Sequence, residues 1–148
     1  MKLIEKYDIQ TEGKNCLVVG RSNIVGRPMS ILMSLRGKYG NSTVTLAHSK
    51  SKNLTELTQK ADIIIMALGI PEFLKSNMIK KDSTVIDVGI TRVEDKAEKR
   101  GYTIKGDVDF DSVAKKVEFL TPVPGGVGPM TIAMLLQNTL DARLLNLS

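Results

Sequence analysis

Five short runs of aliphatic residues, set apart by turn signals and longer amphipathic stretches, constrain the fold of this chain more than any other feature. Each run is apolar nearly throughout instead of alternating between polar and apolar residues. That pattern is typical of strands in a parallel sheet whose two faces are covered by helices. The predicted strands cover residues 16–19, 44–47, 63–67, 84–88 and 117–120. We therefore predict one α/β domain with right-handed crossovers between the strands.

The stretches between these runs have the spacing of amphipathic helices. Apolar residues three and four positions apart predict helices over residues 25–36, 53–60 and 130–145, with short helical turns at 76–80 and 111–116. Pro28 falls near the start of the first helix, where its missing N–H costs little. The charged segment 94–101 predicts a hairpin-like excursion that ends in residues 102–104.

Composition excludes several classes of protein. The 148 residues suit one core, and 42% hydrophobic with 25% charged residues is ordinary for a globular domain. The longest stretch without charged or strongly polar residues, 63–71, is too short to cross a bilayer, and the first six residues lack the apolar core of a signal peptide. Cys16 is the only cysteine, which excludes an intramolecular disulfide and offers no metal-ligand spacing. We expect a cytoplasmic protein without metal or membrane contact.

The net charge of +5 is unevenly distributed. Residues 1–60 contain ten Lys and Arg against four Asp and Glu, whereas the rest of the chain is nearly balanced. Nucleic-acid binding would require basic residues interleaved with aromatic ones, and the three Phe and three Tyr are scattered. A local site for a phosphorylated small molecule explains the basic half better.

A glycine-bearing turn follows the first predicted strand and precedes the first predicted helix. In the segment Gly20-Arg21-Ser22-Asn23-Ile24-Val25-Gly26, backbone N–H groups and the positive end of the helix dipole would converge on a pyrophosphate. Strand, turn and helix in this order are typical of a Rossmann-type dinucleotide-binding sheet, although the middle glycine of the usual G-x-G-x-x-G is absent. The alternative is structural: Gly20 ends the strand, and Gly26 lets the helix pack closely.

The end of the second predicted strand bears on which dinucleotide fits. NAD-specific folds place an Asp or Glu there for the ribose 2′-hydroxyl, whereas a 2′-phosphate needs cations and hydroxyls. Here the strand runs into His48-Ser49-Lys50-Ser51-Lys52, with no acid before Glu56. Ser49 and Arg21 can bind a 2′-phosphate, so the segment favours NADP, with NAD possible and a solvated basic loop as the alternative reading. His48 is expected to be a packing or hydrogen-bonding group.

Three aspartates near predicted strand ends are interpreted as turn residues. Asp87 lies two residues before Gly89, and Asp107 and Asp109 lie in a short polar segment after Gly106. Aspartate is frequent in turns because its carboxylate accepts neighbouring backbone N–H groups. Cys16, inside a central strand, is expected to be an inert core residue.

Residues 121–131, Thr-Pro-Val-Pro-Gly-Gly-Val-Gly-Pro-Met-Thr, form the most unusual stretch of the chain. Three prolines and three glycines restrict some backbone angles and permit others that most residues avoid. The stretch follows the last predicted strand, at the carboxyl edge where α/β sheets bind ligands. We expect it to approach a ligand closely.

Taken in order, these motifs resemble one known family. Residues 20–29, 48–49, 61–63, 85–90, 106–108 and 121–131 look like the cofactor-binding domain of bifunctional methylenetetrahydrofolate dehydrogenase/methenyltetrahydrofolate cyclohydrolases. The likeness runs from about residue 3 to residue 143. It implies binding of NADP or NAD, oxidation of 5,10-methylenetetrahydrofolate to the methenyl compound by hydride transfer, and hydrolysis of that product to 10-formyltetrahydrofolate.

The resemblance also implies roles for individual residues. Ser49 would lie near the 2′-phosphate and Ile90 on the nicotinamide side. The expected cofactor-binding residues are Gly20, Arg21, Ser22, Ile24, Val25, His48, Ser49, Gly69, Ile90 and Thr131. The expected lining of the folate cleft is Pro124, Gly125, Gly126, Val127, Gly128 and Pro129.

The chain departs from the family by lacking the residues of its N-terminal catalytic domain. None of Tyr7, Tyr39 and Tyr102 is followed four residues later by the Lys of the family's Tyr-x-x-x-Lys motif. We therefore predict no catalytic residue here, a remnant of the inter-domain linker in residues 1–14 and a nucleotide-binding domain in residues 15–148. The expected fragment would have little or no activity alone. Its rivals are a stand-alone NADP-binding module and an unrelated NADP enzyme of the shikimate-dehydrogenase kind.

The C-terminal end predicts an interface. Leu144, Leu145 and Leu147 continue an apolar pattern past the last predicted strand. We expect this end to pack on the missing domain in a full-length enzyme, and to be exposed or paired with another chain here. A homodimer that acts on tetrahydrofolate derivatives and binds no nucleic acid is the expected assembly.

Overall fold

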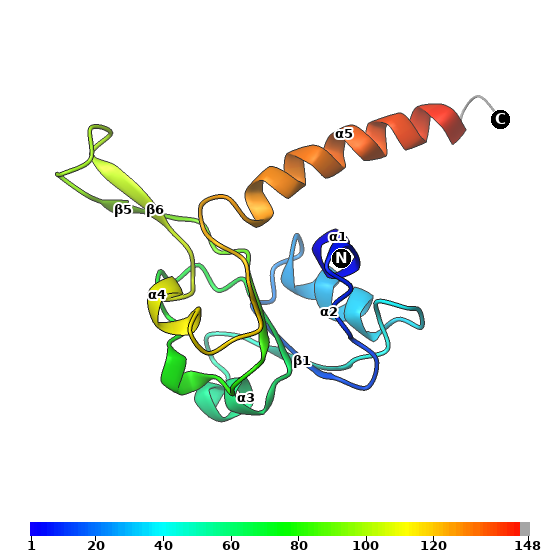
Figure 1. The fold of residues 1–148 in the computed structure, drawn as a ribbon, viewed down its shortest axis with the longest axis horizontal. Coiled ribbons are helices and arrows are strands. Elements are labelled where there is room, and N and C mark those ends of the chain that lie inside the picture. The colour runs from blue at the N-terminus through cyan, green and yellow to red at the C-terminus, as the bar shows by residue number, and fades with distance from the viewer. Residues whose placement is uncertain (146–148) are drawn as a thin grey trace.

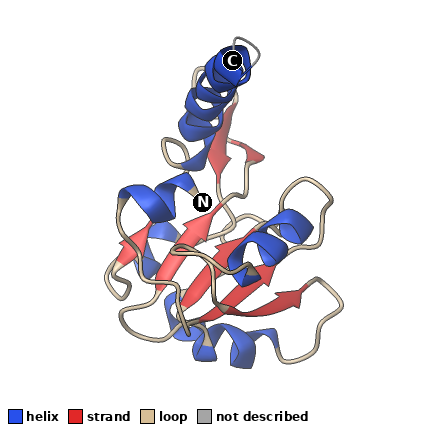
Figure 2. Cartoon of the chain, turned by 90° about the vertical axis from the view of Figure 1, so that its right-hand side faces the viewer, coloured by secondary structure: helices blue, strands red, loops and turns tan. Residues whose placement is uncertain are grey.

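A five-stranded parallel sheet runs through the chain in the order β2-β1-β3-β4-β7, with helices on both sides (Figure 2). The computed structural model describes residues 1–145. The strands of this sheet are β1 (Asn15–Val19), β2 (Thr43–Ala47), β3 (Ile63–Met66), β4 (Thr84–Asp87) and β7 (Phe119–Leu120). The predicted Rossmann-type α/β fold is confirmed.

The register brings the carboxyl ends of the central strands to one edge of the sheet. Val19 is paired with Ala47 of β2 on one side and with Met66 of β3 on the other, and Met66 is paired with Asp87 of β4. The chain adds β2 to one side of β1 and then crosses to add β3 on the other side. The edge between β1 and β3 is therefore the topological switch point, where doubly wound sheets bind their ligands.

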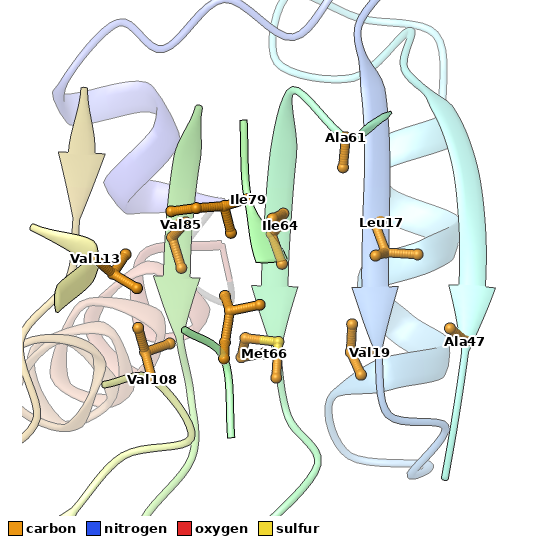
Figure 3. Packing of buried hydrophobic residues seen from close by; sticks show 11 residues of the cluster. Leu17, Val19, Ala47, Ala61, Ile64, Met66, Ile79, Val85, Val108 and Val113 are labelled. Carbon is orange, nitrogen blue, oxygen red and sulfur yellow. The ribbon is translucent and has the colours of Figure 1, made fainter. Parts of the chain in front are cut away.

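Two hydrophobic clusters fill the space between the sheet and its helices. One cluster, drawn in Figure 3, lies under α3 (Leu54–Lys60), the 3-10 turn η1 (Ser76–Met78) and α4 (Phe110–Val113), with Leu17, Ile64 and Val85 at its centre. The opposite cluster lies under α1 (Lys2–Lys6) and α2 (Gly26–Ser34). The continuous aliphatic runs of β1 and β3 reflect burial on both faces.

Segment 1–14 packs on the sheet. Ile4 of α1 and the following Ile9 are buried in the second cluster. The role of this segment as a linker in a longer protein stays a prediction. Cys16 lies in the same cluster, and burial raises the pKa of its thiol to about 12, which makes the thiolate scarce and the residue inert.

Two arms extend beyond the sheet and its helices (Figure 1). The first is an antiparallel hairpin of β5 (Thr91–Glu94) and β6 (Tyr102–Lys105), which confirms the predicted excursion. The second is α5 (Val127–Leu145), which contains no buried residue. No helix within residues 1–145 is long and apolar enough to cross a membrane.

Several elements differ from the predictions in their boundaries or exposure. Helix α5 begins at Val127, before the predicted residue 130, so the Pro-Gly-Gly stretch ends earlier and Val127, Gly128, Pro129 and Thr131 lie in the first turns of a helix. Strand β7 has two residues because it pairs only with the first half of β4. Strand β2 is largely exposed because it is the edge of the sheet. Leu147 lies outside the described residues.

Candidate nucleotide site at the carboxyl edge

The turn after β1 needs its two glycines for packing. Gly20 has a φ of +126°, and a Cβ there would lie 2.1 Å from the Ala67 carbonyl oxygen. A Cβ on Gly26 would lie 1.9 Å from the carbonyl oxygen of Gly20. The structural role that the sequence left open is therefore real, because the backbone must pass this close to β3 before α2 can start.

Ser22 stabilises the turn that leads into helix α2, whose N-cap residue is Val25. The Ser22 Oγ accepts the N–H groups of Val25 at 3.1 Å and Gly26 at 3.4 Å. The hydroxyl proton of Ser22 can still be donated outward. Arg21 and Ile24 are exposed, Ile24 by 87%, so the turn presents a cation and an apolar side chain at the switch point.

The β2 end lies beside this turn, since the N–H of Gly20 donates to the Ala47 carbonyl at 2.8 Å. The imidazole Nδ1 of His48 accepts the N–H of Lys50 at 3.1 Å, and the N–H of His48 donates to Ser51 Oγ at 3.0 Å. His48 thus closes its own turn, in line with the expected hydrogen-bonding role. This turn leaves Ser49 and Lys50 exposed next to the Gly20 turn.

A cavity of about 260 Å³ lies at the same edge of the sheet, between the end of β4 and the start of α5. It brings together Ile90, Thr131 and the whole predicted cleft lining from Pro124 to Pro129. Ile90 is 65% exposed, and Gly125 has a φ of +106° with open space around its would-be Cβ. Gly69, with a φ of +76°, ends the β3 turn in a similarly open position.

Two aspartates that the sequence marks as turn residues do more than form local turns. Asp87 and Asp107 are both buried, and each carboxylate accepts N–H groups from residues distant in the chain. Burial raises the pKa of Asp87 to about 6, with the neighbouring Asp107 carboxylate adding to the rise against the backbone N–H groups that lower it. Asp109 is the turn residue that was expected, since it caps α4 by accepting the N–H of Ser112. The available signal was the glycine near each buried carboxylate, Gly89 and Gly106.

A second cavity, of about 510 Å³, lies between α1, β7 and the start of α5. Leu3, Tyr7, Phe119 and Met130 are among its largely apolar lining residues. No sequence motif indicates this cavity. Within residues 1–145, no group of three or more His, Cys, Asp or Glu side chains is arranged to hold a metal ion.

A comparison with known families shows which family the chain belongs to. Residues 1–146 match the NAD(P)-binding domain of tetrahydrofolate dehydrogenase/cyclohydrolase. The chain belongs to this family. An unrelated enzyme of the shikimate-dehydrogenase kind is thereby excluded.

Individual relatives show the same likeness over nearly the whole chain. Bifunctional protein FolD of Flavobacterium johnsoniae is 67% identical over 143 residues, which cover 97% of this chain and 48% of that protein. The FolD protein of Bacteroides thetaiotaomicron is 56% identical over 142 residues, with 96% and 48% covered. The chain therefore spans about half the length of the curated relatives it matches.

Solved structures agree. The bifunctional FolD enzyme of Campylobacter jejuni superposes with a TM-score of 0.84 at 49% identity, covering 95% of this chain and 46% of that one. The N5,N10-methylenetetrahydrofolate dehydrogenase-cyclohydrolase of Trypanosoma brucei, solved with NADP cofactor and an inhibitor, gives 0.87 at 39% identity and covers 95% and 46%.

Proposed function

We propose that this chain binds NADP along its carboxyl edge and forms one half of an enzyme that oxidises 5,10-methylenetetrahydrofolate and hydrolyses the methenyl product. The observation that carries the proposal is the junction of the Gly20 turn with the end of β2. It lies at the topological switch point, presents Arg21, Ser49 and Lys50, and contains no carboxylate between residues 48 and 55.

The chemistry of this junction fits a dinucleotide phosphate. Within the described residues, no protein acceptor pairs with the backbone N–H groups of Arg21, Ser22 and Asn23, which precede the nine-residue helix α2. N–H groups in this position bind anions well because the helix dipole adds to them. Arg21 can bind a 2′-phosphate through two N–H groups, and a carboxylate that would repel it is absent from this turn.

The residues proposed to contact NADP fall on four neighbouring segments of the edge. They are Gly20, Arg21, Ser22, Ile24, Val25, His48, Ser49, Gly69, Ile90 and Thr131. The residues from Pro124 to Pro129 are proposed to line the adjoining folate cleft. Because Gly20 is packed against Ala67, its contribution is to shape the turn and not to open space for the ligand.

Catalysis needs groups that this chain does not place in the cleft. Bound NADP supplies a hydride acceptor, while this chain binds and orients it and excludes water with apolar residues such as Ile90 and Val127. Among residues 1–145, Asp87 is the only titratable residue that lines the 260 Å³ cavity, and its carboxylate already accepts backbone N–H groups. We therefore propose that proton transfer depends on the other half of a full-length enzyme and that this chain alone has little or no activity.

Titration calorimetry with NADP and NAD tests the binding proposal. The wild-type chain should bind NADP about tenfold or more tightly than NAD, because one charge-assisted bidentate contact is worth that much. Arg21→Ala should remove most of the difference, and Arg100→Ala, in the exposed segment between the hairpin strands, is the matched loss of a cation. Equal affinities of the wild-type chain for both dinucleotides would overturn the NADP preference.

Assembly and setting are further parts of the proposal. We propose a cytoplasmic setting, supported by the unpaired thiol of Cys16. We also propose a homodimer, supported first by the exposed leucines of α5 and second by the open strand edges of the β5–β6 hairpin. Residues 1–14 are proposed to lead into residues 15–148 from a preceding domain. Light scattering that gives a mass of 16.2 kDa at every concentration would contradict the homodimer.

A further inference from the structure

Two buried carboxylates lie at the β4 side of the site, and the function proposed above uses neither of them. Asp107 is fully buried and Asp87 is 2% exposed. Burying a carboxylate is costly unless hydrogen bonds replace its water. The hydrogen bonds that the Asp87 and Asp107 carboxylates accept therefore indicate their role in the structure.

Their bonds link three segments of the carboxyl edge. Asp107 Oδ2 accepts the N–H of Leu68 at 2.6 Å and that of Gly69 at 2.9 Å, both in the turn after β3. Asp87 Oδ1 accepts the N–H of Gly89, after β4, at 2.9 Å and the backbone N–H of Asp107 at 3.1 Å. Asp87 thus holds Asp107, and Asp107 holds the β3 turn.

Two glycines fit tightly against the carboxylates. A Cβ on Gly89 would lie 2.3 Å from Asp107 Cγ, and a Cβ on Gly106 would lie 2.0 Å from Asp87 Oδ2. Each backbone turn rests directly on a carboxylate. The Leu68–Gly69 and Gly89–Ile90 turns consequently have their relative positions set by the Asp87 and Asp107 side chains.

A contribution to stability does not by itself explain why the Asp107 carboxylate is buried. Its Oδ1 is buried and has no hydrogen-bond partner within residues 1–145. Leaving a buried charged oxygen unpaired lowers stability, and such groups in native proteins call for a further explanation. The two turns that Asp107 adjoins end in the exposed residues Gly69 and Ile90, which are both proposed above to contact NADP, and Ile90 lines the 260 Å³ cavity.

The sheet order decides which half of the dinucleotide these turns face. The 2′-phosphate is proposed to lie at the β2 end and the pyrophosphate at the β1 turn. A dinucleotide lying across the switch point must then extend over the ends of β3 and β4. Its nicotinamide half is the part left to contact the two turns.

We propose that Asp107, held by Asp87, is a positioning residue that sets the Leu68–Gly69 and Gly89–Ile90 turns against the nicotinamide half of NADP. This proposal rests on the proposed NADP binding. It predicts a loss that depends on which part of the ligand is present, whereas a purely structural role would weaken every ligand alike.

The test compares two ligands on the 148-residue chain by calorimetry: NADP, and adenosine 2′,5′-bisphosphate, which lacks the nicotinamide half. Asp107→Asn should weaken NADP about tenfold and leave the bisphosphate within about twofold, since only contacts on the β3–β4 side are disturbed. Asp109→Asn is the control, because it removes a carboxylate two residues away that caps α4 and touches neither turn.

Other outcomes overturn the positioning role. Equal losses for both ligands, or no loss for NADP, would show that Asp107 only supports the fold. Should Asp107→Asn unfold, Asp87→Asn retains the Asp107 side chain and should still weaken NADP selectively by about threefold. Equal losses or unfolding in that variant would also overturn the role. A wild-type chain that binds neither ligand would instead reject the proposed function, and this proposal with it.

Discussion

At the scale of single residues, Asp87 makes stability depend on pH in an unusual direction. Burial raises the pKa of Asp87 to about 6 in the folded chain, above its unfolded value near 3.9. Between these values the folded state binds more protons than the unfolded state. The free energy of unfolding should therefore fall on the order of 2–3 kcal/mol as pH rises from about 4 to about 6, and change no further from this source above that.

Urea denaturation at a series of pH values measures this contribution. Asp87→Asn should lose the decline between pH 4 and 6, whereas Glu98→Gln, which removes an exposed carboxylate between the two hairpin strands, should retain it. The comparison with the wild-type chain is needed because Asp62 acts in the opposite sense at lower pH. Burial raises the pKa of Asp62, but its bonds with Lys80 and the N–H of Asn15 outweigh burial and lower it. A profile unchanged by Asp87→Asn would contradict the prediction.

Gly20 offers a second test at the same scale. Gly20→Ala should lower the free energy of unfolding by about 3 kcal/mol, because the φ of +126° is strained for alanine and the new Cβ meets the Ala67 carbonyl. Gly128→Ala is the control, since the space around a Cβ there is open and its φ is unremarkable. Thermal unfolding of both variants measures this difference in stability. If Gly20→Ala were as stable as Gly128→Ala, the packing role of Gly20 would be wrong.

At the scale of elements, α5 is the exception to the layered fold. Leu136 and Leu140, one turn apart, are 68% and 54% exposed, and the helix extends away from the sheet (Figure 1). Exposed apolar surface of this kind normally covers a partner. We expect the 148-residue chain to self-associate through α5, and Leu136→Gln with Leu140→Gln to reduce that association while changing stability by less than about 0.5 kcal/mol.

Sedimentation analysis of the double variant measures the effect of α5. Asn138→Gln, an exposed polar exchange on the same helix, should associate like the wild-type chain. A double variant that associates as strongly as the wild type would move the interface elsewhere, with the β5–β6 hairpin as the next surface to vary. A large loss of stability would instead show that these leucines are buried in the chain itself.

At the scale of the whole molecule, the chain spans about half the length of its relatives. Within residues 1–145, Asp87 is the titratable residue that lines the 260 Å³ cavity, and its carboxylate already accepts backbone N–H groups. We expect no measurable oxidation of 5,10-methylenetetrahydrofolate by the chain with NADP. Adding the separately produced N-terminal half of the Flavobacterium johnsoniae relative should restore NADPH formation, followed by its absorbance. The same N-terminal half without this chain is the control. Normal activity of the chain alone would reject the missing-half proposal.

Much of this architecture could be predicted because it depends on neighbours in the chain. The aliphatic runs predict parallel strands, and the strand–glycine turn–helix order predicts a phosphate site at their carboxyl ends. Contacts between distant segments were not accessible in the same way. Asp87 and Asp107 look like ordinary turn residues in sequence, and only the fold brings Asp107 under the Leu68–Gly69 turn. Likewise, the sequence allows Gly20 either to approach a ligand or to permit close packing. The fold shows the packing role, because the Ala67 carbonyl leaves no room for a Cβ at Gly20.

The sequence by itself determined the α/β class, the candidate cofactor turn and the family, because periodicity and glycine or proline placement act over a few residues. The tertiary structure decided the strand order, the outward course of α5 and the burial of two carboxylates beneath the site. These depend on which surfaces meet across the chain, and burial changes the energy of a charge far more than any local pattern reveals.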